Sequence, residues 1–145
     1  MDVSSFVEDS VASFSAAAET AGVKLSASVS DGLPPIDVDP VRMRSVIGNV
    51  IANALTHTPA DGSVSLNAAR KGDQIAITVT DTGEGIAPEL LARVFDRFVK
   101  GEESKGSGLG LAIAHDIVAA HGGSISIEST VGTGTTVRMT LPIAE

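Results

Sequence analysis

The 145-residue sequence contains no cysteine, no tryptophan and no tyrosine, and it has only four phenylalanines. Without cysteine, disulfides and cysteine-ligated zinc are excluded, and a reducing compartment is compatible. So few aromatic side chains cannot form the stacking platforms that bind single-stranded nucleic acid. No apolar run approaches the roughly 20 residues of a membrane-spanning helix, and the first residues lack the basic start of a signal peptide. We therefore expect a cytoplasmic domain that makes no membrane contact itself, although a parent protein or partner could tether it to the inner face of the membrane.

Basic residues are also scarce. The chain has 10 Lys and Arg against 18 Asp and Glu, a formal net charge of −8. A large nucleic-acid footprint needs a clustered excess of basic side chains, so no nucleic-acid partner is expected. A polyphosphate ligand would have to be held locally, by backbone N–H groups, a divalent cation and a few basic side chains.

At this length we expect one domain over residues 1–145. Apolar residues at three- and four-residue spacing predict helices over the first twenty or so residues and from Pro40, capped by Asp39, to about His57. Further elements are predicted as strands at 23–29, 64–68, 75–79, 125–127 and 137–141, a short helix from Pro88, a polar loop at 95–108 and a helix at 109–120. This order favours an α+β fold, a two-layer sandwich with a mixed sheet and helices on one face.

The second helix carries polar residues at four-residue spacing. Asn49, Asn53 and His57 share one stripe of it, while its other positions are mostly apolar. Two carboxamides inside a helix are unfavourable by propensity, so they call for a reason. An amide oxygen is a neutral, hard ligand suited to a Mg²⁺ that already carries phosphate oxygens. A structural polar network would explain the same pair.

A carboxylate follows the strand at 75–79. Asp81 would lie at the end of that strand, where ligand sites of α/β sheets gather. An ionised carboxylate accepts from the exocyclic amine of adenine, whereas guanine presents an acceptor oxygen there. Gly83 and Gly85 would let the backbone turn closely beneath a ring. An ordinary Asp-Thr-Gly turn remains the alternative.

A glycine-rich segment precedes the last helix. Gly106, Gly108 and Gly110 would bring backbone N–H groups and a helix N-terminus to phosphates. The segment is not a Walker A loop, because no Gly-Lys-Ser/Thr follows. Taken alone it could be a flexible linker. Three such segments in this order nevertheless predict an adenine-nucleotide site.

In this order the segments resemble the catalytic and ATP-binding domain of sensor histidine kinases, within the wider superfamily of gyrase, chaperone, histidine kinase and mismatch-repair ATPases. Residues 49–58 are similar to that family's N box, 81–86 to its G1 box, 95–98 to its F box, 106–111 to its G2 box and 132–136 to its final adenine-side turn. The resemblance covers nearly the whole chain. It implies a Bergerat-type fold of a five-stranded mixed sheet and three helices, with ATP under a mobile lid between about Phe95 and Gly108.

The resemblance also implies roles for single residues. It places Asn53 on Mg²⁺, Asn49 beside the phosphates, Asp81 on the adenine amine and Thr135 near the adenine through water. The candidate catalytic residues are Asn49, Asn53, Arg97 and Lys100, the last two as cations for the γ-phosphate or for the acceptor domain. Many relatives have Lys or Arg and then Tyr where this chain has Thr56 and His57, so we expect His57 to reach the phosphates instead. The boxes supply the remaining nucleotide-binding candidates: Gly83, Gly85, Ile86, Phe98, Lys105, Gly106, Ser107, Gly108, Leu109, Gly110 and Leu111.

The activity that the resemblance implies is transfer of the γ-phosphoryl group of Mg·ATP to a His on a separate dimerisation domain, in cis or in trans, and then to a response regulator. Water-splitting members of the superfamily carry Glu four residues before the metal Asn, whereas Asn49 cannot act as a base, which favours transfer over hydrolysis. His57, His115 and His121 are the only histidines, and none lies in a phosphoacceptor-like sequence, so the chain should not phosphorylate itself. Two alternatives stay open: a serine kinase of the anti-sigma type, and a nucleotide-sensing module without transfer activity.

Overall fold

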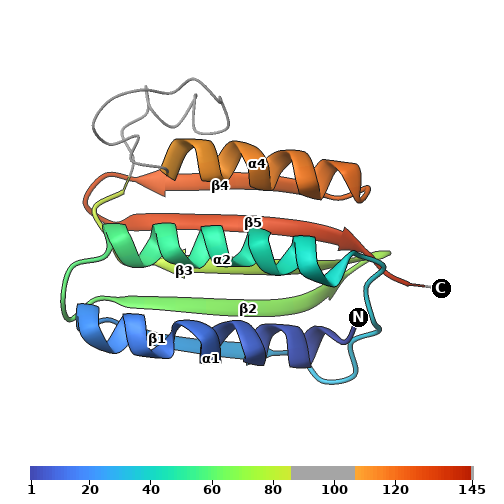
Figure 1. The fold of residues 1–145 in the computed structure, drawn as a ribbon, viewed down its shortest axis with the longest axis horizontal. Helices are drawn as coiled ribbons and strands as arrows, with labels where there is room; N and C mark the ends of the chain where they lie inside the picture. Colours follow the sequence, from blue (N-terminus) through green and yellow to red (C-terminus); the bar gives the residue numbers. More distant parts are fainter. Residues whose placement is uncertain (86–106, 145) are drawn as a thin grey trace.

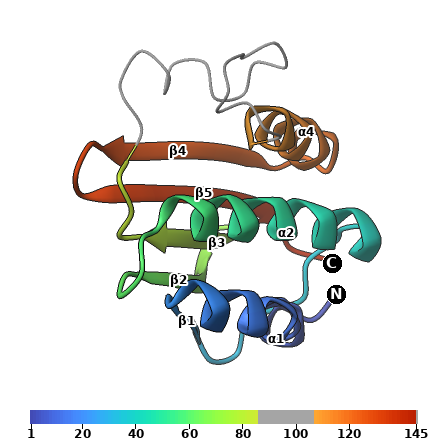
Figure 2. The ribbon, with the colours of Figure 1, turned by 60° about the vertical axis from the view of Figure 1, so that its left-hand side comes forward.

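Three helices lie on one face of a five-stranded sheet (Figures 1 and 2). The computed structural model describes residues 1–85 and 107–144, with the side chains of residues 107–111 left aside. Within these ranges the helices are α1 Val3–Ala21, α2 Pro40–His57 and α4 Ser107–Ala120, and the strands are β1 Lys24–Val29, β2 Ser63–Lys71, β3 Gln74–Asp81, β4 Ser124–Thr130 and β5 Gly134–Pro142. The predicted α+β sandwich with helices on one face is confirmed.

The sheet is mixed, with the strand order β1-β2-β3-β5-β4. The pair β1 and β2 is parallel, which requires a crossover connection, and α2 supplies it. All other neighbouring strands are antiparallel. The last strand, β5, lies between β3 and β4 (Figure 1). The ends of β3 and β5 are therefore neighbours although they are far apart in sequence.

Alternation along β3 decides which side chains face the helices. Ile75, Ile77 and Val79 are buried on that face, and the next position with the same orientation is Asp81. In the register between the two strands, Asp81 pairs with Thr135 of β5, which is also buried. An acid and a hydroxyl thus occupy positions that the pattern would otherwise give to apolar residues.

Capping residues fix the helix ends. The Asp39 carboxylate accepts from the backbone N–H of Val41 at 2.9 Å, and Pro40 is the first residue of α2, as predicted. Gly22 closes α1 in the left-handed conformation at φ 74°.

The last helix differs from the prediction at its start. It begins at Ser107 rather than at Leu109, so Gly108 and Gly110 lie in its first turn and not in a loop before it. The predicted short helix from Pro88 and the implied lid fall outside the described residues.

Candidate functional site

The polar stripe on α2 is present as predicted. Asn49, Asn53 and His57 follow one another at one-turn spacing, and all three are half-buried, while Val50 and Leu55 beside them pack into the core. The Oδ1 atom of Asn53 is buried and has no hydrogen-bond partner within the described part of the chain. A buried acceptor left without a partner costs about 1–3 kcal/mol, so this oxygen is poised for a ligand.

Asp81 is fixed at the end of β3 by two backbone donors. Its Oδ1 accepts from the N–H of Gly83 at 2.8 Å and from the N–H of Thr135 at 3.2 Å, and the residue is only 7% exposed. Both donors use the same oxygen. With respect to residues 1–85 and 107–144, Oδ2 is left free to accept from a ligand.

Burial sets the charge behaviour of this acid. Loss of hydration raises the pKa of Asp81, while the N–H groups of Gly83 and Thr135 and the nearby His57 oppose that rise. The ionised form is therefore costly in the free protein. A hydrogen-bond donor brought by a ligand would relieve part of that cost.

The loop after β3 contacts two neighbours so closely that glycine is required. A Cβ at Gly83 would collide with the carbonyl oxygen of His57, and a Cβ at Gly85, which has φ 79°, would collide with that of Thr130. These contacts place residues 81–85 between the end of α2 and the turn before β5. The glycines of the predicted G1 segment thus act through close backbone packing.

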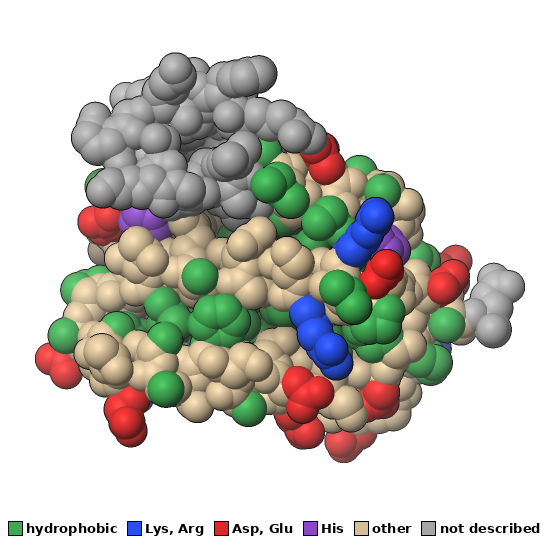
Figure 3. Space-filling model, in the orientation of Figure 1, with side chains coloured by type: hydrophobic (Ala, Val, Ile, Leu, Met, Phe, Trp, Pro, Cys, Tyr) green, Lys and Arg blue, Asp and Glu red, His purple; other side chains and the backbone are tan. Residues whose placement is uncertain are grey.

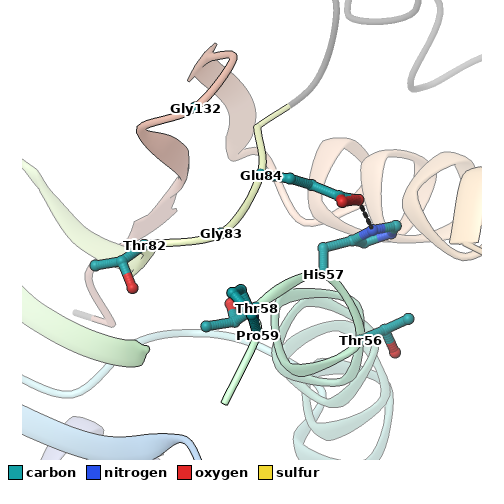
Figure 4. A pocket seen from close by; sticks show the side chains of 8 residues that line it. All are labelled: Thr56, His57, Thr58, Pro59, Thr82, Gly83, Glu84 and Gly132. Carbon is teal, nitrogen blue, oxygen red and sulfur yellow. Dashed lines mark hydrogen bonds and ion pairs between the residues drawn. The ribbon is translucent and has the colours of Figure 1, made fainter. Parts of the chain in front are cut away.

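His57 and Glu84 meet at the mouth of a cavity. Nδ1 of His57 lies 3.3 Å from Oε1 of Glu84, and Figure 4 shows the two side chains pointing toward one another. The cavity has a volume of about 410 Å³ and extends along the end of α2 and the loop after β3. Its lining residues are Thr56, His57, Thr58, Pro59, Thr82, Gly83, Glu84 and Gly132. Of the predicted nucleotide-binding residues, it therefore includes His57 and Gly83.

The predicted site residues separate into three groups. Asp81, Gly83 and Thr135 are joined by hydrogen bonds, and the α2 stripe forms the second group. The third group is the start of α4, which packs along α2. Its residues Ser107, Gly108, Leu109, Gly110 and Leu111 are described in their backbone only. Ile86, Arg97, Phe98, Lys100, Lys105 and Gly106 lie outside the described residues.

Two contacts were not predicted from the sequence. Glu84 lies inside the G1 segment, but it was given no role, and its partner His57 is 27 positions away. Ser129 also had no predicted role, and its Oγ lies 2.9 Å from Oγ1 of Thr135. The place of Glu84 in a glycine-rich loop could have drawn attention to it, whereas Ser129 lies within β4 and has no such signal.

Charges on the helix-covered face are mixed. Figure 3 shows single Lys and Arg side chains among Asp and Glu over the described part of that face. The net charge of −8 opposes the approach of any polyphosphate. Binding of such a ligand would depend on the local donors at the end of α2 and at the start of α4.

A family comparison gives a match over residues 38–145, to the family described as histidine kinase-, DNA gyrase B- and HSP90-like ATPase. The chain belongs to this ATPase family. The matched region includes α2, the loop after β3, α4 and β5, and hence every described candidate residue of the site.

Similar proteins agree with this membership. The sensor-like histidine kinase SenX3 of Mycobacterium tuberculosis is 35% identical over 147 residues, which cover 98% of this chain and 36% of SenX3. The chain thus spans about a third of the length of that curated relative. Among solved structures, the catalytic domain of histidine kinase ThkA has a TM-score of 0.88 at 21% identity, over 99% of this chain and 93% of that one. Full-length ShkA in complex with AMPPNP has a TM-score of 0.88 at 32% identity, over 99% of this chain and 31% of that one.

These likenesses confirm the five-stranded, three-helix fold that the resemblance implied. They also confirm the recognition of a histidine-kinase type of ATP-binding domain. Among the helices of the described ranges, none is both long and apolar enough to span a bilayer.

Proposed function

We propose that residues 1–145 form the catalytic and ATP-binding domain of a protein-histidine kinase. In this role the domain binds Mg·ATP and passes the γ-phosphoryl group to a His on a phosphoacceptor dimerisation domain, in cis or in trans. A response regulator would receive the group next. Membership of the ATPase family and the likeness to SenX3 and ShkA support the proposal. For ThkA, a solved complex with the response regulator TrrA exists.

The observation that carries the proposal is the carboxylate of Asp81. It is buried, it is fixed through Oδ1 by two N–H groups, and its Oδ2 is free of described partners. An ionised acceptor in this position pairs with the exocyclic amine of adenine and repels the carbonyl oxygen of guanine. Thr135, whose N–H donates to the same acid, would take part in adenine binding through water. Selection of adenine over guanine follows from this arrangement.

The α2 stripe fits a divalent cation. The buried, unpartnered Oδ1 of Asn53 is a hard oxygen of the kind that Mg²⁺ prefers, so we assign Asn53 as its protein ligand. Bound Mg²⁺ neutralises phosphate charge and orients the phosphates. Asn49, one turn earlier, would donate from its amide to a phosphate oxygen.

The start of α4 supplies donors of a second kind. Its first N–H groups, that of Gly108 among them, have no intrahelical partners and suit phosphate oxygens. We assign further phosphate and acceptor-domain contacts to Arg97, Lys100 and Lys105. Ile86 and Phe98 would contact the nucleotide apolarly.

Transfer is favoured over hydrolysis for a chemical reason. Asn49 stands where a water-activating member of the superfamily has Glu, and a carboxamide cannot accept a proton as a base. The domain would therefore contribute positioning and charge neutralisation, while the acceptor His attacks. We place this reaction on the cytoplasmic side, where ATP is available, with tethering through a parent protein or partner.

A labelling experiment tests the proposed reaction. The chain is incubated with γ-labelled ATP, Mg²⁺ and His-box dimerisation domains, and the stability of the protein-bound label is measured. We expect an acid-labile phosphohistidine on the acceptor, and its loss in Asn53→Ala. As the matched control, Asn67→Ala removes an exposed amide from β2 and should leave transfer unchanged.

Two outcomes would contradict the proposal. An acid-stable label would identify a serine kinase of the anti-sigma type. Nucleotide binding without label on any cognate dimerisation domain would instead identify a nucleotide-sensing module.

A further inference from the structure

Glu84 is held at three points beside the end of α2. Its N–H donates to the carbonyl oxygen of His57 at 3.3 Å, and its carbonyl oxygen accepts from the N–H of Gly132 at 2.9 Å. Its side-chain Oε1 lies 3.3 Å from Nδ1 of His57 (Figure 4). Because the backbone of Glu84 is already fixed on both sides, the side-chain contact requires no further ordering of the loop.

The contact determines what the imidazole offers to a ligand. A carboxylate only accepts, so Nδ1 of His57 carries the proton that is donated to Glu84. A phosphate oxygen also only accepts, so the ring that contacts it is the imidazolium, in which Nε2 carries a second proton and donates. Nε2, on the opposite side of the ring, has no partner among the described residues. A carboxylate bound to one ring nitrogen also fixes the ring orientation and thereby directs the other nitrogen.

The position of His57 suits the phosphate end of a nucleotide. It follows Asn53 by one turn on the same stripe, and it lines the cavity at the end of α2. A cationic donor is favoured at a helix C-terminus. Thr56 is uncharged and supplies no such cation. Its hydroxyl donates to the carbonyl oxygen of Ala52 at 2.8 Å, and its side chain points away from the His57–Glu84 pair in Figure 4.

We propose that Glu84 is a positioning residue that holds the imidazole of His57 through Nδ1, so that Nε2 contacts the phosphates of the bound nucleotide. This inference rests on the proposed nucleotide-binding function and adds a residue to its site. Without the contact to His57, the Glu84 carboxylate would be a further negative charge beside the phosphates. Engaged with the imidazole, it converts a flexible side chain into an oriented donor.

The test separates the phosphate-dependent part of affinity from the rest. Calorimetry of the full chain with Mg²⁺ measures the dissociation constants of AMPPNP and of adenosine for each variant. In His57→Ala we expect AMPPNP binding to weaken about tenfold while adenosine binding is unchanged. Glu84→Ala should weaken AMPPNP binding by several-fold in the same selective way. Glu84→Gln should recover most of the loss, because its amide oxygen still accepts from Nδ1–H.

Two controls complete the design. The double variant His57→Ala/Glu84→Ala should bind AMPPNP no more weakly than His57→Ala does, because Glu84 acts through the ring and, without the ring, adds only a negative charge beside the phosphates. Glu128→Ala removes an exposed carboxylate from β4 and should change neither ligand, which controls for net charge.

Several results would overturn the inference. Glu84→Ala could weaken the binding of AMPPNP and of adenosine equally, or it could tighten AMPPNP binding. It could also weaken AMPPNP binding further when it is added to His57→Ala. In these cases the unsubstituted chain still binds AMPPNP, so the proposed nucleotide-binding function stands. If neither ligand binds the unsubstituted chain, both that function and the inference are overturned.

Discussion

At the scale of single residues, Asp81 illustrates a conflict between stability and binding. The alternation of β3 places it on the core face, where burial raises its pKa because the ionised carboxylate is poorly hydrated. A folded-state pKa above the unfolded value means that the associated stability is fully present below the unfolded pKa and is lost as pH rises through the folded pKa. The acid is therefore retained at neutral pH at a cost to the free protein.

This conflict predicts the behaviour of Asp81→Asn. The amide oxygen of Asn can still accept from the N–H groups of Gly83 and Thr135, and no charge is buried. At neutral pH the free energy of unfolding of the variant should therefore equal or exceed that of the unsubstituted chain. As pH falls through the pKa of Asp81, the free energy of unfolding of the unsubstituted chain should rise relative to that of the variant. Urea denaturation of both proteins across that range measures the difference. A variant clearly less stable at neutral pH would show that the ionised form is net stabilising.

At the scale of elements, His121 joins the two helices that carry the site. Its Nδ1 donates to the carbonyl oxygen of Ile117 at 2.8 Å, and its Nε2 accepts from the N–H of Asp39 at 3.1 Å. Both contacts require the neutral ring with its proton on Nδ1. His121 is thus an acceptor that links the end of α4 to the start of α2.

This link predicts a modest and specific loss of stability. His121→Ala removes the acceptor for Asp39 and should lower the free energy of unfolding by about 1 kcal/mol. His121→Gln should recover part of it, because an amide oxygen can accept the same N–H. His115→Ala is the matched control, because its ring is 46% exposed. Equal stability of all the proteins in urea would show that the link carries no net energy.

At the scale of the whole molecule, local signals predicted the elements well. The cap at Asp39 and the strands β2, β3 and β5 depend on neighbours in sequence, and the structure has them where they were expected. The position of β5 between β3 and β4 depends on pairing across many residues, which periodicity does not encode. The resemblance to a family supplied the five-stranded mixed sheet, whereas the strand order comes from the structure.

The same distinction between local features and long-range contacts applies to the site. The residue types of Asn53 and Asp81 suggested a chemistry from the sequence alone, and the two residues lie in α2 and at the end of β3, as predicted. The hydrogen-bond partners of the site residues were harder to predict from the sequence, because they are distant in the chain. Thr135 lies 54 positions from Asp81, and Glu84 lies 27 positions from His57. Contacts of this range follow from the tertiary fold.

The proposed function depends on a pocket in which Asp81 selects adenine. The most direct test is calorimetry of AMPPNP and GMPPNP, each with Mg²⁺, on the unsubstituted chain and on Asp81→Asn. We predict binding of the adenine nucleotide, binding of its guanine counterpart at least about tenfold weaker, and loss of that preference in the variant. Equal binding of the two nucleotides, or an unchanged preference in Asp81→Asn, would contradict the account.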